Sequence, residues 1–392
     1  MNIVDITEFY SERGGGVRSH LTIRGHVLCQ LGHPHTVIAP GPRDEERVLC
    51  ARGSAPQQTP IQARVIRIAG PQLPYDPTYH VFGRFGTVQR IVKASKADVL
   101  EAHSPYLGVA AVLSCGRTAS RIRTAFWHAD HVGTYVEPAL GRTLGETASH
   151  VLTRPLWSGV RALLAPFDAT FASGVAQVAR LRAAGVRNVL HTPFGVDTDT
   201  FFPRGPDPVL RRELAGDLQG DLVVAAGRLA VEKRWDVVLD AFARLRERRP
   251  AVLVIFGDGP ERARLERRAP RGVRFLGFET DRLKLARALA AADVLVHGCP
   301  YETFGLGVVE AIASGLPVVV PDRGGAAESV DPSCSATYAS LDSAACAAAL
   351  ETMLARDRTE LRARAVDAAA RVTTVGQHFR AVLSAYDDLL AA

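Results

Sequence analysis

The chain repeats one pattern along its length: a short apolar run, then a glycine or proline turn, then a stretch with helical periodicity. This alternation builds parallel sheets whose strands are joined by crossover helices, so it predicts an α/β fold. One helix is expected at 17–31. Strands are expected in one series at 2–6, 35–39, 64–68, 99–102, 122–127 and 169–172, and in a second at 222–226, 251–256, 273–276, 294–297 and 317–320.

The restart of the pattern predicts two domains. A length of 392 residues exceeds what one hydrophobic core usually supports. The stretch that follows residue 193 is rich in proline and glycine, which is typical of a linker. We therefore expect an N-terminal domain at 1–195, a linker at 196–218, a C-terminal domain at 219–375 and a helix at 376–392 that returns to the N-terminal domain.

The composition is that of a folded protein outside the membrane, with 47% hydrophobic and 22% charged residues. The N-terminus has no signal-peptide pattern, no apolar run is long enough to cross a bilayer, and six scattered cysteines indicate reduced thiols. We expect a cytoplasmic protein, peripheral at most on the inner face of the membrane. The formal charge of +6 suits an anionic ligand such as a nucleotide, or an acidic membrane surface.

The loops that follow strands are the places to look for a site, because ligands of open parallel sheets lie outside the carboxyl ends of the strands. The first such loop carries three glycines, Gly14 to Gly16, and opens a helix. Gly15 and Gly16 would let the backbone approach a phosphate at the helix N-terminus, although a plain flexible turn is the simpler interpretation.

Two further loops lie in the second half. Arg228 and Lys233 follow the strand at 222–226 and offer two cations to one diphosphate; Lys233 is one of only four lysines. Gly257 and Asp258 follow the next strand and would border a nucleotide base, or form an ordinary turn.

The segment 300–311 carries the strongest signal. Glu302 and Glu310 lie eight residues apart at the start of a helix, which would separate them by about 12 Å if the segment were wholly helical. Carboxylates suit the vicinal hydroxyls of a hexose and a ribose. A diphosphate between the two sugars would rest on the backbone amides of the intervening residues, Thr303, Phe304, Gly305, Leu306 and Gly307.

These residues together resemble a known family. Glu302 and Glu310 look like the E-x7-E motif of retaining glycosyltransferases of family GT4, which have the GT-B fold. The resemblance extends in order over nearly the whole chain, through the glycines at 14–16, residues 194–197, 227–233 and 257–260, and the glycines at 324–325. It implies two Rossmann-like domains whose parallel sheets face each other across a cleft, and a hexose transfer from a nucleotide-diphosphate sugar.

The resemblance also implies roles for single residues. Arg228 and Lys233 would bind the donor diphosphate, Glu302 the transferred sugar and Glu310 the ribose. A histidine that approaches the donor sugar in the family is matched by His128, with His131 as its rival; a structural histidine is the alternative.

The expected enzyme needs no metal and no cofactor, since the nucleotide sugar is a substrate. Asp197 and Asp199 spell the D-x-D of metal-dependent transferases, but they follow residues 194–196, where the resembled family carries an interdomain turn. Cations and helix amides can stabilise the leaving phosphate instead.

Several alternatives stay open at this point. The donor would be GDP-mannose or a UDP-hexose, and the acceptor a lipid, a glycan or a small molecule, with no nucleic acid involved. Acceptor loops are expected at 71–85 and 131–154. A nucleotide-sugar epimerase of the same fold and a non-catalytic nucleotide-sugar-binding protein are the rival functions, whereas a phosphorylase would need a pyridoxal lysine that is not evident.

Overall fold

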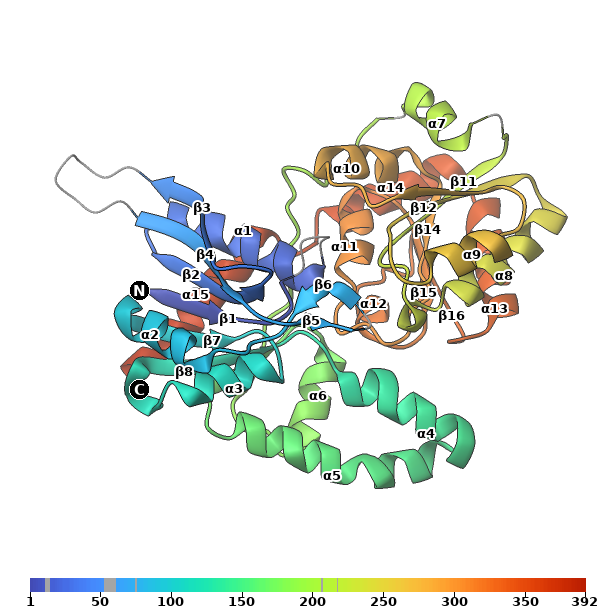
Figure 1. Cartoon of the computed structure of the whole chain (residues 1–392). Helices are drawn as coiled ribbons and strands as arrows, with labels where there is room; N and C mark the ends of the chain where they lie inside the picture. Colours follow the sequence, from blue (N-terminus) through green and yellow to red (C-terminus); the bar gives the residue numbers. More distant parts are fainter. Residues whose placement is uncertain (11–14, 53–60, 75, 206, 217) are drawn as a thin grey trace. The chain divides into compact units, whose positions relative to one another are not determined.

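A computed structural model describes residues 1–10, 15–52, 61–74, 76–205, 207–216 and 218–392. The chain divides into two compact units (Figure 1). The first unit comprises Met1–Pro193 together with Gly376–Ala392, and the second comprises Phe194–Val375. The segment expected as a linker, 196–218, falls within the second unit and contains the helix α7 (Pro208–Ala215).

The first unit is built on a sheet whose strands pair in parallel, except for one antiparallel strand at its edge, β3. A short hairpin of β5 (Gln72–Leu73) and β6 (Asp76–His80) lies outside this sheet. The strand order is β10 (Val189–His191), β9 (Ala169–Ala172), β8 (Ser120–Trp127), β7 (Ala97–Ala102), β1 (Ile3–Ile6), β2 (His35–Gly41), β4 (Ile61–Ala69) and β3 (Glu45–Arg52).

Helices cover both faces of this sheet. Successive side chains of each strand point to opposite faces, so both faces have residues that pack against helices. Val4 and Ile6 of β1 share a core cluster with Val88 and Val109 of α2 and α3, whereas Asp5 between them pairs with Arg24 of α1. The helix α15, drawn red in Figure 1, brings the C-terminal residues back into this unit. The helices are α1 (Gly16–Gln30), α2 (Phe85–Ser95), α3 (Leu107–Ser114), α4 (Glu137–Leu144), α5 (Glu146–Leu164), α6 (Val175–Ala183) and α15 (Val375–Ala391).

The second unit has a wholly parallel sheet, whose central strands β11 and β12 are almost completely buried and apolar, as expected for strands covered on both faces. Its strand order is β13 (Val273–Gly277), β12 (Ala251–Phe256), β11 (Asp221–Ala226), β14 (Val294–Val296), β15 (Val318–Pro321) and β16 (Ala336–Tyr338). Besides α7, its helices are α8 (Trp235–Arg248), α9 (Arg262–Arg268), α10 (Arg282–Ala291), α11 (Leu306–Ala313), α12 (Gly325–Glu328), α13 (Ser343–Ala355) and α14 (Arg358–Ala369).

The structure confirms the α/β class and the two parallel-sheet series. Sequence patterning missed β3, β10 and β16, as well as the hairpin. The strand β3 carries the charged sequence EERVLCAR, and charge on an edge strand hides the apolar alternation while discouraging further pairing. None of the helices in the described ranges is long and apolar enough to cross a membrane.

Candidate active site

Glycines allow the loops that follow β11 and β12 in the second unit to pack closely against each other. A Cβ atom at Gly257, whose φ is 148°, would lie 1.8 Å from the carbonyl oxygen of Gly227, and a Cβ at Gly259 would lie 2.4 Å from that of Leu229. The Asp258 carboxylate accepts a hydrogen bond from the amide of Gly259 at 2.8 Å. These glycines therefore have a packing reason to be present, whether or not a nucleotide base lies beside them.

The loop after β14 packs against the loop after β11. A Cβ at Gly298 would approach the carbonyl oxygens of Arg234 and Lys233 at 2.8 and 2.9 Å. This close contact sets Lys233, at the end of the short 3-10 helix Val231–Lys233, against the segment that carries Glu302. The Lys233 Nζ lies 2.5 Å from Glu302 Oε1, and His297 Nε2 lies 3.3 Å from the same oxygen.

The electrostatics of this cluster keep both charges in place. Burial raises the pKa of the Glu302 carboxyl, but the Lys233 ammonium and His297 outweigh this effect and hold that pKa far below its ordinary value. Burial lowers the pKa of Lys233, and the attraction of Glu302 more than reverses it. The pair is therefore fully ionised at neutral pH, with the side chains 24% and 18% exposed and so within reach of solvent.

Arg228 belongs to the same loop, just after β11, and its side chain is exposed. Its backbone carbonyl accepts a hydrogen bond from Trp235 Nε1 at 2.9 Å, which holds the loop against the start of α8. Arg228 and Lys233 are thus carried by one anchored loop, as the sequence suggested.

The segment 300–311 is not wholly helical, so the 12 Å spacing derived from an unbroken helix does not apply. Glu302, Thr303 and Phe304 lie in the loop, Gly305 has a φ of 84°, and α11 begins only at Leu306. The glycines after β15 hold this loop: Gly325 donates to the Glu302 carbonyl at 2.7 Å, and a Cβ at Gly324 would lie 2.6 Å from the Pro300 carbonyl oxygen. The amides of Leu306 and Gly307 lie in the first turn of the helix, where backbone donors have no intrahelical partner.

Glu310 lies one turn further along α11 and is only 6% exposed. Its carboxylate forms an ion pair with Arg282 of α10, whose guanidinium also lies 4.7 Å from the ring centroid of Phe201. Burial raises the pKa of Glu310 and the nearby Asp197 adds to the rise, against the effect of Arg282. Sequence reasoning missed Arg282 and His297; the only signal for His297 was its position at the end of a strand.

The first unit holds the remaining predicted residues. Gly15, with a φ of 126°, precedes α1, and Gly16 is its exposed first residue with open space around its Cα. Gly14 lies outside the described residues. His128 directly follows β8, and its Nε2 lies 2.7 Å from His103 Nδ1. His131 instead packs among the rings of Phe9, Tyr106 and Tyr135, so the two histidines have different surroundings.

Possible metal ligands among the described residues include Asp197 and three clusters of side chains. Asp197 forms a local turn by accepting from the backbone of Asp199 and Thr200 and from the Thr200 hydroxyl. Three groups place possible ligand atoms within 4.8 Å of one another. Their carboxylates already face Lys233 or Arg24, and the remaining histidine group contains the hydrogen bond between His103 and His128. The three groups are His297, Cys299 and Glu302; Asp5, Glu101 and His103; and His20, His103 and His128.

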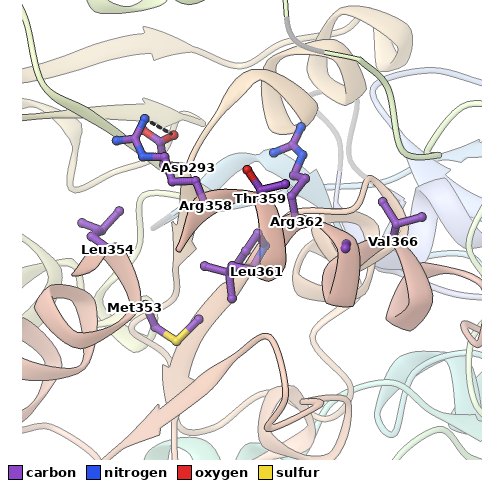
Figure 2. Close-up of a pocket in the computed structure, with 10 residues that line it drawn as sticks. Asp293, Met353, Leu354, Arg358, Thr359, Leu361, Arg362 and Val366 are labelled. Carbon is purple, nitrogen blue, oxygen red and sulfur yellow. Dashed lines mark ion pairs between the residues drawn. The ribbon is translucent and has the colours of Figure 1, made fainter. Parts of the chain in front are cut away.

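Figure 2 shows a pocket of about 440 Å³ in the second unit. Asp293 and Pro317, which line it, immediately precede β14 and β15, so the pocket lies at the amino edge of the sheet. Arg358 of α14 pairs there with Asp293 at 3.5 Å. This pocket is therefore separate from the loops that carry Lys233 and Glu302.

Comparison with known proteins adds a relationship by sequence. Residues 14–200 match the family described as Glycosyltransferase Family 4, and residues 220–356 match Glycosyl transferases group 1. The chain is 32% identical over 328 residues to a GDP-mannose-dependent alpha-(1-6)-phosphatidylinositol dimannoside mannosyltransferase of Mycobacterium tuberculosis, covering 82% of this chain and 79% of that protein. It is 30% identical over 362 residues to a GDP-mannose-dependent alpha-mannosyltransferase of Mycolicibacterium smegmatis, with 91% and 90% covered.

Solved structures show the same fold. Sucrose-phosphate synthase from Thermosynechococcus elongatus superposes with a TM-score of 0.75 at 20% identity, covering 100% of this chain and 99% of that one. Anabaena HepE in complex with UDP-glucose gives 0.72 at 19% identity, with 98% and 100% covered. The site loops, the family matches and the relatives agree: this chain belongs to glycosyltransferase family 4 and is a GT-B glycosyltransferase that transfers a hexose from a nucleotide sugar.

Proposed function

We propose that the enzyme is a retaining mannosyltransferase that takes mannose from GDP-mannose and passes it to a hydroxyl of a membrane glycolipid. The observation that carries the proposal is the ionised pair of Lys233 and Glu302, 2.5 Å apart beside the N-terminus of α11. The choice of GDP-mannose follows the names of four curated relatives in two mycobacteria and Corynebacterium glutamicum, which are GDP-mannose-dependent.

Within this proposal the second unit binds the donor. Lys233 and Arg228 neutralise the diphosphate, and the amides at 303–307 add backbone donors at the helix N-terminus. Glu302 accepts hydrogen bonds from the mannose hydroxyls, and its low pKa keeps it an acceptor at every physiological pH. Glu310 accepts from the ribose once Arg282 shares or releases its carboxylate.

The first unit contributes His128 and the glycines Gly15 and Gly16. In the proposed reaction the acceptor hydroxyl attacks the anomeric carbon on the face from which GDP leaves. The hydroxyl proton passes to the departing phosphate, the new glycosidic bond forms and the bond to phosphate breaks. The protein supplies position and charge stabilisation rather than a covalent intermediate, and no metal ion is needed.

Donor choice is tested by calorimetry with GDP and UDP and by following slow hydrolysis of a panel of nucleotide sugars. We expect uptake of GDP in preference to UDP, and turnover of GDP-mannose. A preference for UDP with turnover of a UDP-hexose would reject the donor assignment while keeping the enzyme class. Absence of uptake of either nucleotide by the folded protein would reject the site.

We also propose that α5 rests on an anionic lipid surface. Its inner face is anchored, since Trp157 Nε1 and the Thr153 hydroxyl donate to Glu137 at 3.0 and 3.2 Å. Its outer face exposes apolar side chains that helical periodicity places on one stripe, with cations along one flank. The apolar residues are Val151, Leu152, Leu156 and Leu163, exposed by 50, 53, 46 and 44%, and the exposed basic residues are His150, Arg154 and Arg161.

This combination fits a helix lying at a membrane surface, with apolar residues among the acyl chains and arginines at the phosphates. If two copies of the chain instead packed through antiparallel α5 helices, Arg154 and Arg161 of one copy would face the same arginines of the other. This like-charge contact disfavours a dimer as the occupant of this face. Co-sedimentation of the double variant Leu152→Asn, Leu156→Asn with phosphatidylglycerol vesicles should fall at least about tenfold. The matched control is Leu283→Asn, an equally exposed leucine of α10, at 51%. Unchanged sedimentation, or a dimer in ultracentrifugation that the double variant abolishes, would reject the lipid surface.

A further inference from the structure

A buried charge cluster lies directly beneath His128 in the first unit. Asp5 of β1, Glu101 of β7 and Arg24 of α1 are all 0% exposed. Arg24 pairs with Asp5 at 3.0 Å and with Glu101 at 2.7 Å. Ions so deeply buried are tolerated only where their charges are compensated.

Arg24 alone does not balance this cluster, because two carboxylates face one guanidinium. Three further groups that donate hydrogen bonds to Asp5 or Glu101, namely Tyr386, Thr124 and His35, are neutral. Tyr386 and Thr124 donate hydroxyl protons to Glu101 Oε2 at 2.7 and 2.6 Å. His35 Nε2 lies 2.6 Å from Asp5, but burial lowers the pKa of this histidine despite its acidic partner, so it donates as a neutral ring.

His103 supplies the missing positive charge. Its Nε2 lies 3.0 Å from Glu101 Oε1 and 3.3 Å from Asp5 Oδ1. Burial lowers the pKa of His103, yet the two carboxylates raise it further than burial lowers it. As an imidazolium, His103 makes the cluster neutral overall.

The second nitrogen of His103 then determines the state of His128. An imidazolium carries a proton on both nitrogens, and His103 Nδ1 lies 2.7 Å from His128 Nε2. We propose that His103 is a charged positioning residue that donates from Nδ1 to His128 Nε2, and so fixes His128 as the neutral tautomer with its proton on Nδ1. His128 then presents a hydrogen-bond donor, and its Nε2 is not free to act as a general base.

The inference rests on the proposed function in one respect, namely that His128 faces the donor sugar. An Nδ1–H of fixed orientation suits a sugar hydroxyl or the glycosidic oxygen, both of which accept hydrogen bonds. Burial lowers the pKa of His128 well below its ordinary value, and the neighbouring His103 lowers it further, so His128 stays neutral beside the imidazolium.

The arrangement implies a pH dependence. The pKa of His103 lies above its ordinary value, so the arrangement is complete below about 6.5 and is lost as pH rises through the raised value. Deprotonated His103 would let His128 carry its proton on either nitrogen. The ionisable groups around His103, on four strands or strand ends and two helices, are Asp5, His20, Arg24, His35, Glu101, His128, His378 and Tyr386.

Two-bond ¹H–¹⁵N correlation spectra of the protein labelled with ¹⁵N-histidine test this directly. Single substitutions assign the signals of the 12 histidines. We expect His103 doubly protonated at about pH 6, below the ordinary pKa of a histidine, and His128 protonated on Nδ1. A neutral His103 or an Nε2–H form of His128 in the wild type would overturn the proposal without any variant having to fold.

Two variants of His103 separate positioning from structure. In His103→Asn the amide nitrogen can replace Nδ1 as the donor to His128, whereas in His103→Gln the longer amide can reach the acids but not His128. We expect kcat to fall on the order of 10- to 100-fold in His103→Gln and by less in His103→Asn, with GDP affinity preserved in both. The loss of activity at high pH should disappear in His103→Asn. Equal losses in the two variants would overturn the positioning role. Full activity of His128→Ala with the expected spectra would instead reject only the proposed role of His128.

Discussion

The two units differ in how deeply they bury their charged side chains. In the second unit Lys233 and Glu302 lie in loops after strands, and their side chains are 24% and 18% exposed. In the first unit Asp5 and Glu101 lie within strands beneath α1 and are completely buried. The partly exposed pair lies within reach of a ligand, whereas the buried cluster can only support the residues packed against it. In the proposed function, this difference separates residues that bind the donor from residues that hold the binding residues in place.

The largest expected effect comes from the buried cluster. Arg24→Met should lower the free energy of unfolding by about 3–5 kcal/mol, because it leaves two buried carboxylates with too little positive charge. Urea unfolding at pH 7 measures the change. The control Arg364→Met removes an exposed (i, i+4) pair with Glu360 and should cost about 0–1 kcal/mol. Equal losses in the free energy of unfolding for Arg24→Met and Arg364→Met would mean that burial does not set the contribution of these ion pairs to stability.

Substitution in the partly exposed pair of Lys233 and Glu302 should show the reverse, with activity affected more than stability. Lys233→Ala should reduce kcat about 10²- to 10³-fold, since the cation that we propose for the leaving diphosphate is lost. Lys284→Ala provides the matched control, because Lys284 pairs with Glu279 on the surface of the same unit. Steady-state kinetics with GDP-mannose measure both. Near-normal turnover in Lys233→Ala would remove that residue from the site.

A backbone change tests how the loops after β11 and β12 are held. Gly257→Ala should destabilise the protein by about 1–3 kcal/mol, because the new Cβ would meet the Gly227 carbonyl oxygen and the positive φ disfavours alanine. Gly159→Ala, in an exposed helical position with open space, should be neutral or slightly stabilising. Thermal unfolding compares the two, and a harmless Gly257→Ala would contradict the close loop packing.

The smallest effect is expected at Glu310, which shares features of both regions. Burial raises its pKa, so acidification protonates it earlier than an ordinary glutamate and should weaken GDP binding as the pH falls from neutral towards the ordinary glutamate pKa of about 4.3. Arg282→Ala removes the compensating cation and should move that loss to higher pH, with affinity at pH 7 reduced about 3- to 10-fold. Calorimetry across this pH range would refute a ribose role for Glu310 if the affinity stayed constant in both proteins.

The positions of the candidate site residues in the second unit were predictable from sequence, because these residues lie in contiguous segments after apolar strands. Arg228 and Lys233 share one loop, and Glu302 and Glu310 lie in one segment that runs from a loop into the helix α11. The spacing within the second segment was not predictable, since the break at Gly305 depends on the loop packing against Gly324 and Gly325. Arg282 also escaped notice, because nothing in its own segment indicates a buried acid 28 residues away.

The sequence by itself determined the α/β class, the two parallel series and the loops at which chemistry is expected, because strand and helix periodicity and turn chemistry are local properties. Only the tertiary structure decided which charges meet. Arg24 reaches Tyr386 across 362 positions of sequence, and His103 lies between Asp5, Glu101 and His128. Such a cluster leaves no periodic trace along the chain, since its members come together only when strands β1, β7 and β8 pair and α1 and α15 pack against them.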